Sequence, residues 1–72
     1  TKITYSISHA DFVILKIYNN SGQEVQTLVN KYKGAGNHTI IFDANNFSSG
    51  IYHYKLQVGN KTTKTKKMIL MR

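Results

Sequence analysis

Apolar and polar residues alternate along most of this chain with the two-residue period of a β-strand. In the first segment Ile3, Tyr5 and Ile7 fall on one face, while threonine and serine occupy the other. Runs of the same kind follow, and glycine, asparagine and serine turn signals separate them. The pattern predicts six strands, at residues 3–8, 12–18, 23–29, 38–43, 51–58 and 61–72.

The third of these segments is the only one that also fits a turn of helix, because Val25 and Leu28 are three residues apart. It is too short to sustain a helix by itself, so we favour a short, irregular strand. Gly59 and Asn60 predict a two-residue hairpin. Phe47 lies in a polar connector and is expected to close one end of the core. The other expected core positions are Val13, Leu15, Ile17, His38, Ile40, Phe42, Tyr52, Tyr54, Leu56 and Val58.

Six short strands with a turn signal about every 8–12 residues predict an all-β fold. We expect a small antiparallel immunoglobulin-like β-sandwich of six to seven strands. A chain of 72 residues makes a single domain, 1–72, with little room for a deep cleft. It has no cysteine, so no disulfide framework or thiolate metal site is available. Because the chain begins with Thr1, we expect it to be a piece of a longer protein.

The formal net charge is +7, and every charged residue after Asp43 is basic. A basic end can bind nucleic acid or an anionic surface, whereas solvated lysines on a strand give the same pattern. The aromatic residues that could stack on bases, Phe42, Tyr52 and Tyr54, fall at core positions. We therefore expect no nucleic-acid binding; the alternative predicts binding that weakens steeply with salt.

The histidines, His9, His38 and His53, show no local pair of the kind that zinc sites use. His38 and His53 could lie on neighbouring strands, with Asp43 completing a set. The sequence from Asp43 to Asn45 spaces oxygen ligands as a calcium loop does, but the remaining acidic positions are missing. An Asx turn explains it better, and we expect neither a metal nor another cofactor.

Catalytic patterns are also missing from the sequence. The three carboxylates, Asp11, Glu24 and Asp43, fall in or beside separate turns, whereas paired acids need a shared cleft. The chain has no Gly-x-Ser-x-Gly nucleophile elbow and no phosphate loop followed by a helix. We therefore predict that this chain is not an enzyme.

The end of the chain departs from the alternation, because four consecutive residues, Met68 to Met71, are apolar. In a two-layer sandwich one face of such a strand meets solvent. Either a partner covers Ile69 and Met71, or they pack on a preceding domain or loop, or the strand is buried on both sides. Lys66, Lys67 and Arg72 add positive charge, and an edge strand can also accept a partner's backbone hydrogen bonds.

Several segments, in order and with the expected spacing, resemble the type A C-terminal sorting domain carried by cargo of the type IX secretion system in Bacteroidetes-like bacteria. The resemblance covers essentially the whole chain, and a related flagellar hook-capping immunoglobulin-like module shares much of it. Phe42 stands where the family commonly has tryptophan, which reduces the volume of a core side chain. The matching segments are 15–19 (LKIYN), 21–29 (SGQEVQTLV), 36–38 (GNH), 42–44 (FDA), 47–52 (FSSGIY), 54–56 (YKL) and 66–72 (KKMILMR).

The resemblance implies a non-enzymatic signal at the C-terminus of a larger secreted protein. The outer-membrane type IX translocon would recognise it, and a surface sortase would then remove it in many members. The covalently attached N-terminal cargo would travel through the periplasm to the cell surface or exterior. By position, the resemblance implies recognition through Gly50, Tyr52, Lys67, Met68, Leu70 and Arg72. The apolar, cation-flanked chain end adds Lys66, Ile69 and Met71 to the expected recognition residues.

A structural role is the alternative hypothesis. The same sandwich would then serve as an adhesion, spacer or fibre-forming module on a cell surface. This hypothesis predicts self-association or glycan binding by the isolated domain.

Overall fold

The fold consists of β-strands joined by turns. The computed structural model describes residues 2–43, 45, 47–60 and 62–71, without the side chains of 62 and 63. No helix occurs in these residues, and so none that could cross a membrane. The strands are β1 (Lys2–Ile7), β2 (Asp11–Asn19), β3 (Glu24–Lys33), β4 (Gly36–Ile41), β5 (Gly50–Val58) and β6 (Thr62–Leu70).

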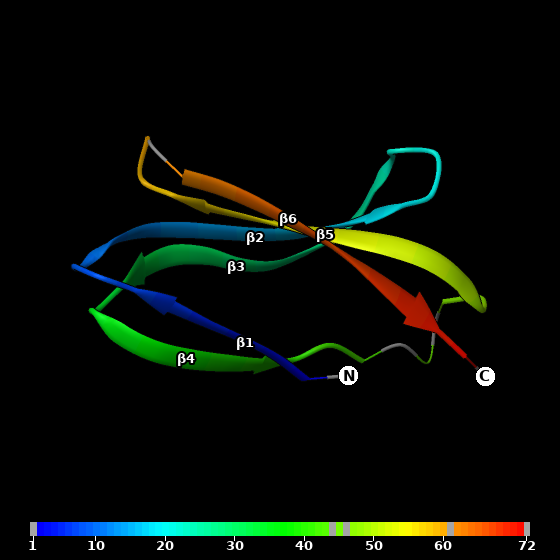
Figure 1. Cartoon of the computed structure of the whole chain (residues 1–72), viewed down its shortest axis with the longest axis horizontal. Helices are drawn as coiled ribbons and strands as arrows, with labels where there is room; N and C mark the ends of the chain where they lie inside the picture. Colours follow the sequence, from blue (N-terminus) through cyan, green and yellow to red (C-terminus); the bar gives the residue numbers. More distant parts are fainter. Residues whose placement is uncertain (1, 44, 46, 61, 72) are drawn as a thin grey trace.

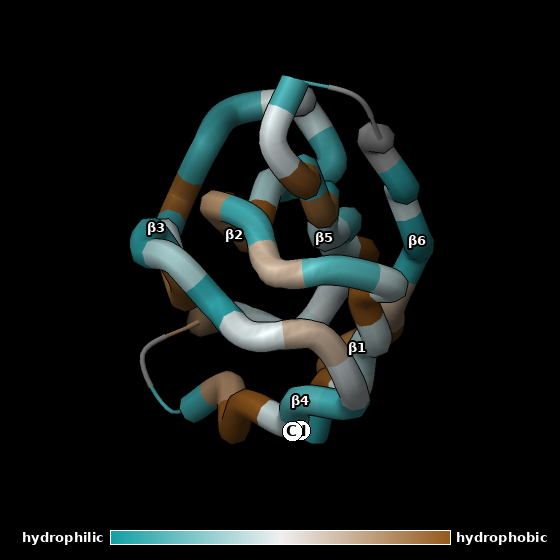
Figure 2. The backbone as a smooth tube through the Cα atoms, turned by 90° about the vertical axis from the view of Figure 1, so that its left-hand side faces the viewer, coloured by the Kyte–Doolittle hydropathy of each residue, from teal (hydrophilic) through white to brown (hydrophobic). Residues whose placement is uncertain are grey.

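The strands form two antiparallel sheets stacked as the layers of a sandwich (Figure 1). The larger sheet has the order β3-β2-β5-β6, and the smaller consists of β1 and β4. Seen end-on, β3 and β6 lie at opposite sides of the larger sheet, with β4 beneath it and β1 on the side of β6 (Figure 2). The predicted all-β antiparallel sandwich is confirmed.

The core forms where the apolar faces of the two sheets meet. Val13, Leu15 and Ile17 on β2 are fully buried, as the alternation predicts. Leu15 lies opposite Leu56 on β5, so two central strands place leucines side by side. The other buried side chains are Ile3, Tyr5, Ile7, Val29, Phe42, Tyr52 and Leu70. Tyr54 and Val58 pack against this cluster from partly buried positions, as does Ile40.

Phe47 closes one end of the core, as expected from the sequence. Its ring centroid lies 5.2 Å from that of Phe42 and 5.9 Å from that of Tyr52, the latter in an edge-to-face arrangement. Phe42 and Tyr52 are buried and Tyr54 is partly buried, so these three rings are engaged in the core, as the sequence pattern predicts.

Two turns are stabilised by hydrogen bonds from backbone N–H groups to an asparagine or aspartate side chain. Asn19 Oδ1 accepts hydrogen bonds from the backbone N–H groups of Ser21 (3.0 Å) and Gln23 (2.9 Å), and Gly22 supplies the positive φ of 87°. Asp43 Oδ1 accepts the backbone N–H of Asn45 at 3.0 Å, which confirms the expected Asx turn.

The third strand is longer than predicted, because β3 continues to Lys33 and pairs with nearly all of β2. Its pairing shifts between Leu15 and Lys16, which skips Leu28, and again between Ile17 and Tyr18, which skips Val25. These two irregularities explain the broken two-residue period. The segment is a strand, and the helical interpretation is excluded.

Other details differ from the sequence-based predictions. Three residues, 59–61, separate the paired Val58 and Thr62, so the two-residue hairpin is wrong, although Gly59 has the positive φ of 58° that a tight turn needs. β4 begins at Gly36, because it pairs with the end of β1. His38 and His53 do not lie on neighbouring strands, since β4 and β5 belong to different sheets.

Candidate recognition surface on the last strand

β6 is the edge strand of the larger sheet and is held there by β5. Leu70 lies opposite Gly50, and Met68 lies opposite Tyr52. Leu70 is buried and Met68 is partly buried against the core. One face of the strand end is therefore anchored inside the sandwich.

The other face of the strand end is open to solvent. Ile69 is 61% exposed, and Met71, one residue beyond β6, is 87% exposed. The hypothesis of a closing strand buried on both sides is therefore wrong for this domain. Packing on a loop of the domain is excluded by the same exposure.

Ile51, which the pattern at the chain end does not single out, enlarges this apolar surface. It lies directly opposite Ile69 on β5 and is 37% exposed. With residues of the β2–β3 turn it also lines a shallow hollow of about 420 Å³. The alternation already assigned Ile51 to the solvent face, but only the pairing of the strands reveals its neighbour. We call Ile51, Ile69 and Met71 the outer patch.

The lysines of β6 divide between its two faces. Lys67 lies opposite His53 on the outer face, beside the outer patch. Lys64 and Lys66 lie opposite Leu56 and Tyr54, so they belong to the inner row with Met68 and Leu70. All three lysines are exposed.

Tyr52 and Gly50 lie outside the outer patch, since Tyr52 is buried and Gly50 is half-buried. Tyr52 is buried, and its hydroxyl donates a 2.9 Å hydrogen bond to the Ser48 carbonyl oxygen. Gly50 begins β5 with a φ of 152°, which favours glycine. Both residues support the inner side of β6. Arg72, the last of the predicted recognition residues, lies outside the described residues.

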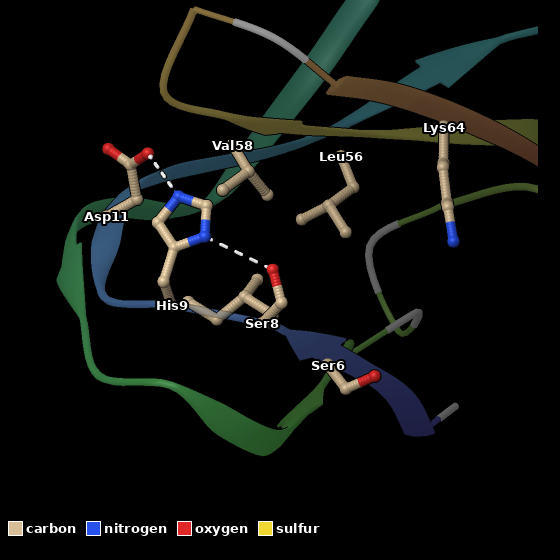
Figure 3. Close-up of a pocket in the computed structure, with 8 residues that line it drawn as sticks. Ser6, Ser8, His9, Asp11, Leu56, Val58 and Lys64 are labelled. Atoms are coloured by element: carbon tan, nitrogen blue, oxygen red, sulfur yellow. Dashed lines mark hydrogen bonds and ion pairs between the residues drawn. The ribbon is translucent and has the colours of Figure 1, made fainter.

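A second polar cluster lies in the link between β1 and β2. His9 Nδ1 is 3.1 Å from Ser8 Oγ, and His9 Nε2 is 3.5 Å from Asp11 Oδ2 (Figure 3). Ser8, His9 and Asp11 carry the same three chemical groups as a hydrolytic triad. They differ from a triad in that the His9 side chain is mostly exposed and Ser8 and His9 are adjacent in the sequence of one link. The described residues contain no cluster of three side chains that could hold a metal ion.

Three groups in other parts of the sandwich have shifted pKa values. A hydrogen bond with Lys16 Nζ, 2.9 Å from Glu24 Oε1, lowers the pKa of the Glu24 carboxyl and raises the pKa of the Lys16 ammonium. Burial raises the pKa of the Tyr5 hydroxyl. None of these three groups lies in the outer patch, which is apolar with a cationic border.

Comparison with known proteins assigns this chain to a family. The family described as the secretion system C-terminal sorting domain matches residues 1–71, which is nearly the whole chain. No curated protein and no solved structure matches the chain. The chain belongs to the C-terminal sorting domains of the type IX secretion system, the signals by which cargo is exported through the periplasm and outer membrane to the cell surface or exterior.

Proposed function

We propose that the type IX translocon recognises this domain through the end of β6. The observation that supports this most directly is the exposure of Ile69 on an edge strand whose opposite face is anchored in the core. Large apolar side chains in such a position gain free energy when a partner covers them, about 1.5–3 kcal/mol for each one fully buried. The unpaired edge adds backbone hydrogen bonds with a defined direction.

The predicted recognition residues divide into two roles in this proposal. Ile69, Met71, Lys66 and Lys67 contact the translocon, and by its match to the family sequence Arg72 joins them. The remaining four, Gly50, Tyr52, Met68 and Leu70, hold β6 in place from the inside.

The lysines would mainly affect the rate and specificity of the encounter. Exposed charges steer association over about a Debye length and contribute little to final affinity. The apolar residues of the outer patch would provide most of the affinity, as apolar anchors commonly do at protein interfaces.

The proposed role as an export signal leads to further proposals about the domain as a whole. We propose that residues 1–72 form one domain attached to an N-terminal cargo protein, that a surface sortase acts on it after export, and that the domain itself is not an enzyme. Consistent with this, the two hollows beside the β2–β3 turn are shallow and lined mainly by exposed residues.

A reporter protein fused ahead of the domain, in a bacterium with a type IX system, tests the proposal. The double variant Ile69→Asn with Met71→Asn should leave the reporter in the periplasm, as should deletion of residues 67–72. The matched control, Tyr32→Asn with Ile41→Asn, removes two side chains that are each 66% exposed on β3 and β4. It should be exported normally.

Export of the double variant at the level of the parent would overturn the proposal. Thermal unfolding of both variants in isolation keeps the result interpretable, since the replaced side chains are all exposed and neither variant should lose its fold. If the control were retained equally, general loss of surface apolar area would explain the effect, and the proposal would also fail.

A further inference from the structure

A second surface lies on the open side of the sandwich, between β1 and β6. Each of these strands lies at the edge of its sheet, and both edges lie on the same side of the molecule (Figure 2). A cavity of about 350 Å³ opens between them, with Ile7, Leu56 and Val58 among its apolar lining residues. The smaller sheet has two strands and the larger has four, so the inner face of the larger sheet is incompletely covered here.

The inner row of β6 changes character along its length. Leu70 and Met68 pack on the core, but Lys66 and Lys64 follow at the same two-residue spacing. Lys64 lines the cavity, and its side chain extends into the space between the two sheets (Figure 3). An unpaired ammonium group is costly to bury, so this half of β6 cannot close on the core by itself.

No carboxylate side chain in the described residues compensates these two lysines. All three acidic residues lie in the described part, and each is engaged elsewhere. Glu24 pairs with Lys16, and Asp43 caps its own turn. Asp11 lines the same cavity, but it faces His9 and accepts the backbone N–H of Phe12 at 2.7 Å.

We infer that this slot binds an extended acidic segment of another protein, which adds as a strand to the free edge of β1. Residues two apart on a strand face the same side, as Lys64 and Lys66 do. Two carboxylates at that spacing can therefore meet both lysines, while an apolar residue next in the same row fills the cavity over Leu56 and Val58.

This site is separate from the outer patch and does not depend on export. The outer patch uses the opposite face of β6, and its proposed partner is the translocon; of the described residues assigned to translocon contact, only Lys66 lies on the inner row and is shared with the slot. Binding in the slot can be measured on the isolated chain, so its failure and the failure of the recognition proposal give different results.

The test uses an acetylated and amidated nine-residue peptide with valine at positions 2 and 8, glutamate at 4 and 6, and threonine elsewhere. The pattern is the same in both directions, so either strand direction is sampled. In an NMR titration of the ¹⁵N-labelled 72-residue chain, amide signals of β1 and of Lys64 and Lys66 should shift. A peptide with glutamine in place of glutamate should bind about tenfold more weakly.

Variants of the chain test whether Lys64 and Lys66 are the lysines that bind the glutamates of the peptide. Lys64→Thr with Lys66→Thr should weaken binding of the glutamate peptide about tenfold, whereas Lys31→Thr with Lys55→Thr removes the same charge from exposed positions on other strands and should not. Replacing Lys64 and Lys66 with glutamate should transfer preference to a peptide with lysine at positions 4 and 6.

Four results would overturn the inference. The first is equal binding of the glutamate and glutamine peptides. The second is binding of the glutamate peptide by the Lys64→Thr, Lys66→Thr variant as tightly as by the parent. The third is amide shifts that fall on the outer patch instead of β1. Inorganic polyphosphate that competed as well as the peptide would also overturn it, since that would indicate a general anion site.

Discussion

Ile51 and Ile69 lie directly opposite each other on neighbouring antiparallel strands, and both side chains face solvent. Cross-strand apolar pairs of this kind stabilise a sheet by about 0.2–1 kcal/mol. The exposure of this pair at an edge, beside Lys67, supports contact with a partner, and we propose that Ile51 also belongs to the recognition surface.

Ile51→Asn should therefore reduce export of a fused reporter, although less than loss of Ile69 and Met71 together. The free energy of unfolding should fall by less than about 1 kcal/mol, because the side chain is already partly exposed. Quantifying the reporter in periplasmic and surface fractions, beside urea unfolding of the isolated domain, separates the two effects. Full export of the variant would remove Ile51 from the surface.

Tyr52 should act through stability, because its hydroxyl is directed at the Ser48 carbonyl oxygen inside the domain. Tyr52→Phe should lower the free energy of unfolding by about 1 kcal/mol, the usual contribution of such a hydrogen bond. Tyr32→Phe is the control, since the Tyr32 hydroxyl makes a 3.4 Å contact with the Ala10 carbonyl oxygen at an exposed position. Equal unfolding midpoints for the two variants would contradict this role.

Alternation alone was sufficient to predict most of the fold. Val13, Leu15 and Ile17 are fully buried because period two fixes which face of a strand meets the core. The same rule was misleading at Val25 and Leu28, where two irregularities in pairing insert extra residues into β3. Such insertions depend on the partner strand, so a single segment of sequence does not reveal them.

The candidate site was predicted only in part for the same reason. The run of apolar residues at the chain end identified Ile69 and Met71, but the contribution of Ile51 depends on how β5 pairs with β6. The composition likewise shows an excess of lysines, but it does not show which face of the strand each lysine occupies. Only the pairing places Lys64 opposite Leu56 on the inner row and Lys67 opposite His53 on the outer face.

Gly59 should be difficult to replace. It has a φ of 58°, and a Cβ atom there would lie 2.5 Å from Asp11 Oδ2. Gly59→Ala must both adopt a left-handed conformation and displace the carboxylate that accepts the Phe12 N–H, so we expect a loss of about 2 kcal/mol in unfolding free energy.

Gly34→Ala is the matched control, because no atom lies within 4 Å of the position that its methyl group would take, and its φ lies outside the left-handed range. It should change stability by less than about 1 kcal/mol. Adding Asp11→Ala to the Gly59 variant removes the steric conflict and should recover part of the loss. Urea unfolding of the four proteins measures this, and equal effects at the two glycines would refute the steric argument.

The Lys16–Glu24 pair should give the domain a small acid sensitivity. The hydrogen bond with Lys16 lowers the pKa of Glu24 in the folded state, so the folded protein holds its proton less tightly than the unfolded chain. The stabilisation is complete above the carboxyl pKa of the unfolded chain, about 4.3, and is lost as the pH falls through the lower folded pKa. For Lys16, whose pKa is raised, it is present below about pH 10.4 and is lost as the pH rises through the folded pKa.

Thermal midpoints measured from pH 6 to pH 2 should therefore fall more steeply for the parent than for Glu24→Gln, whose residue 24 does not titrate. The difference should shrink in 1 M salt, because the pair is solvent-accessible and exposed charges are screened. Identical pH profiles for the two proteins at low salt would show that the pair contributes nothing to stability. A steeper profile for the glutamine variant would reverse the sign of the assigned shift.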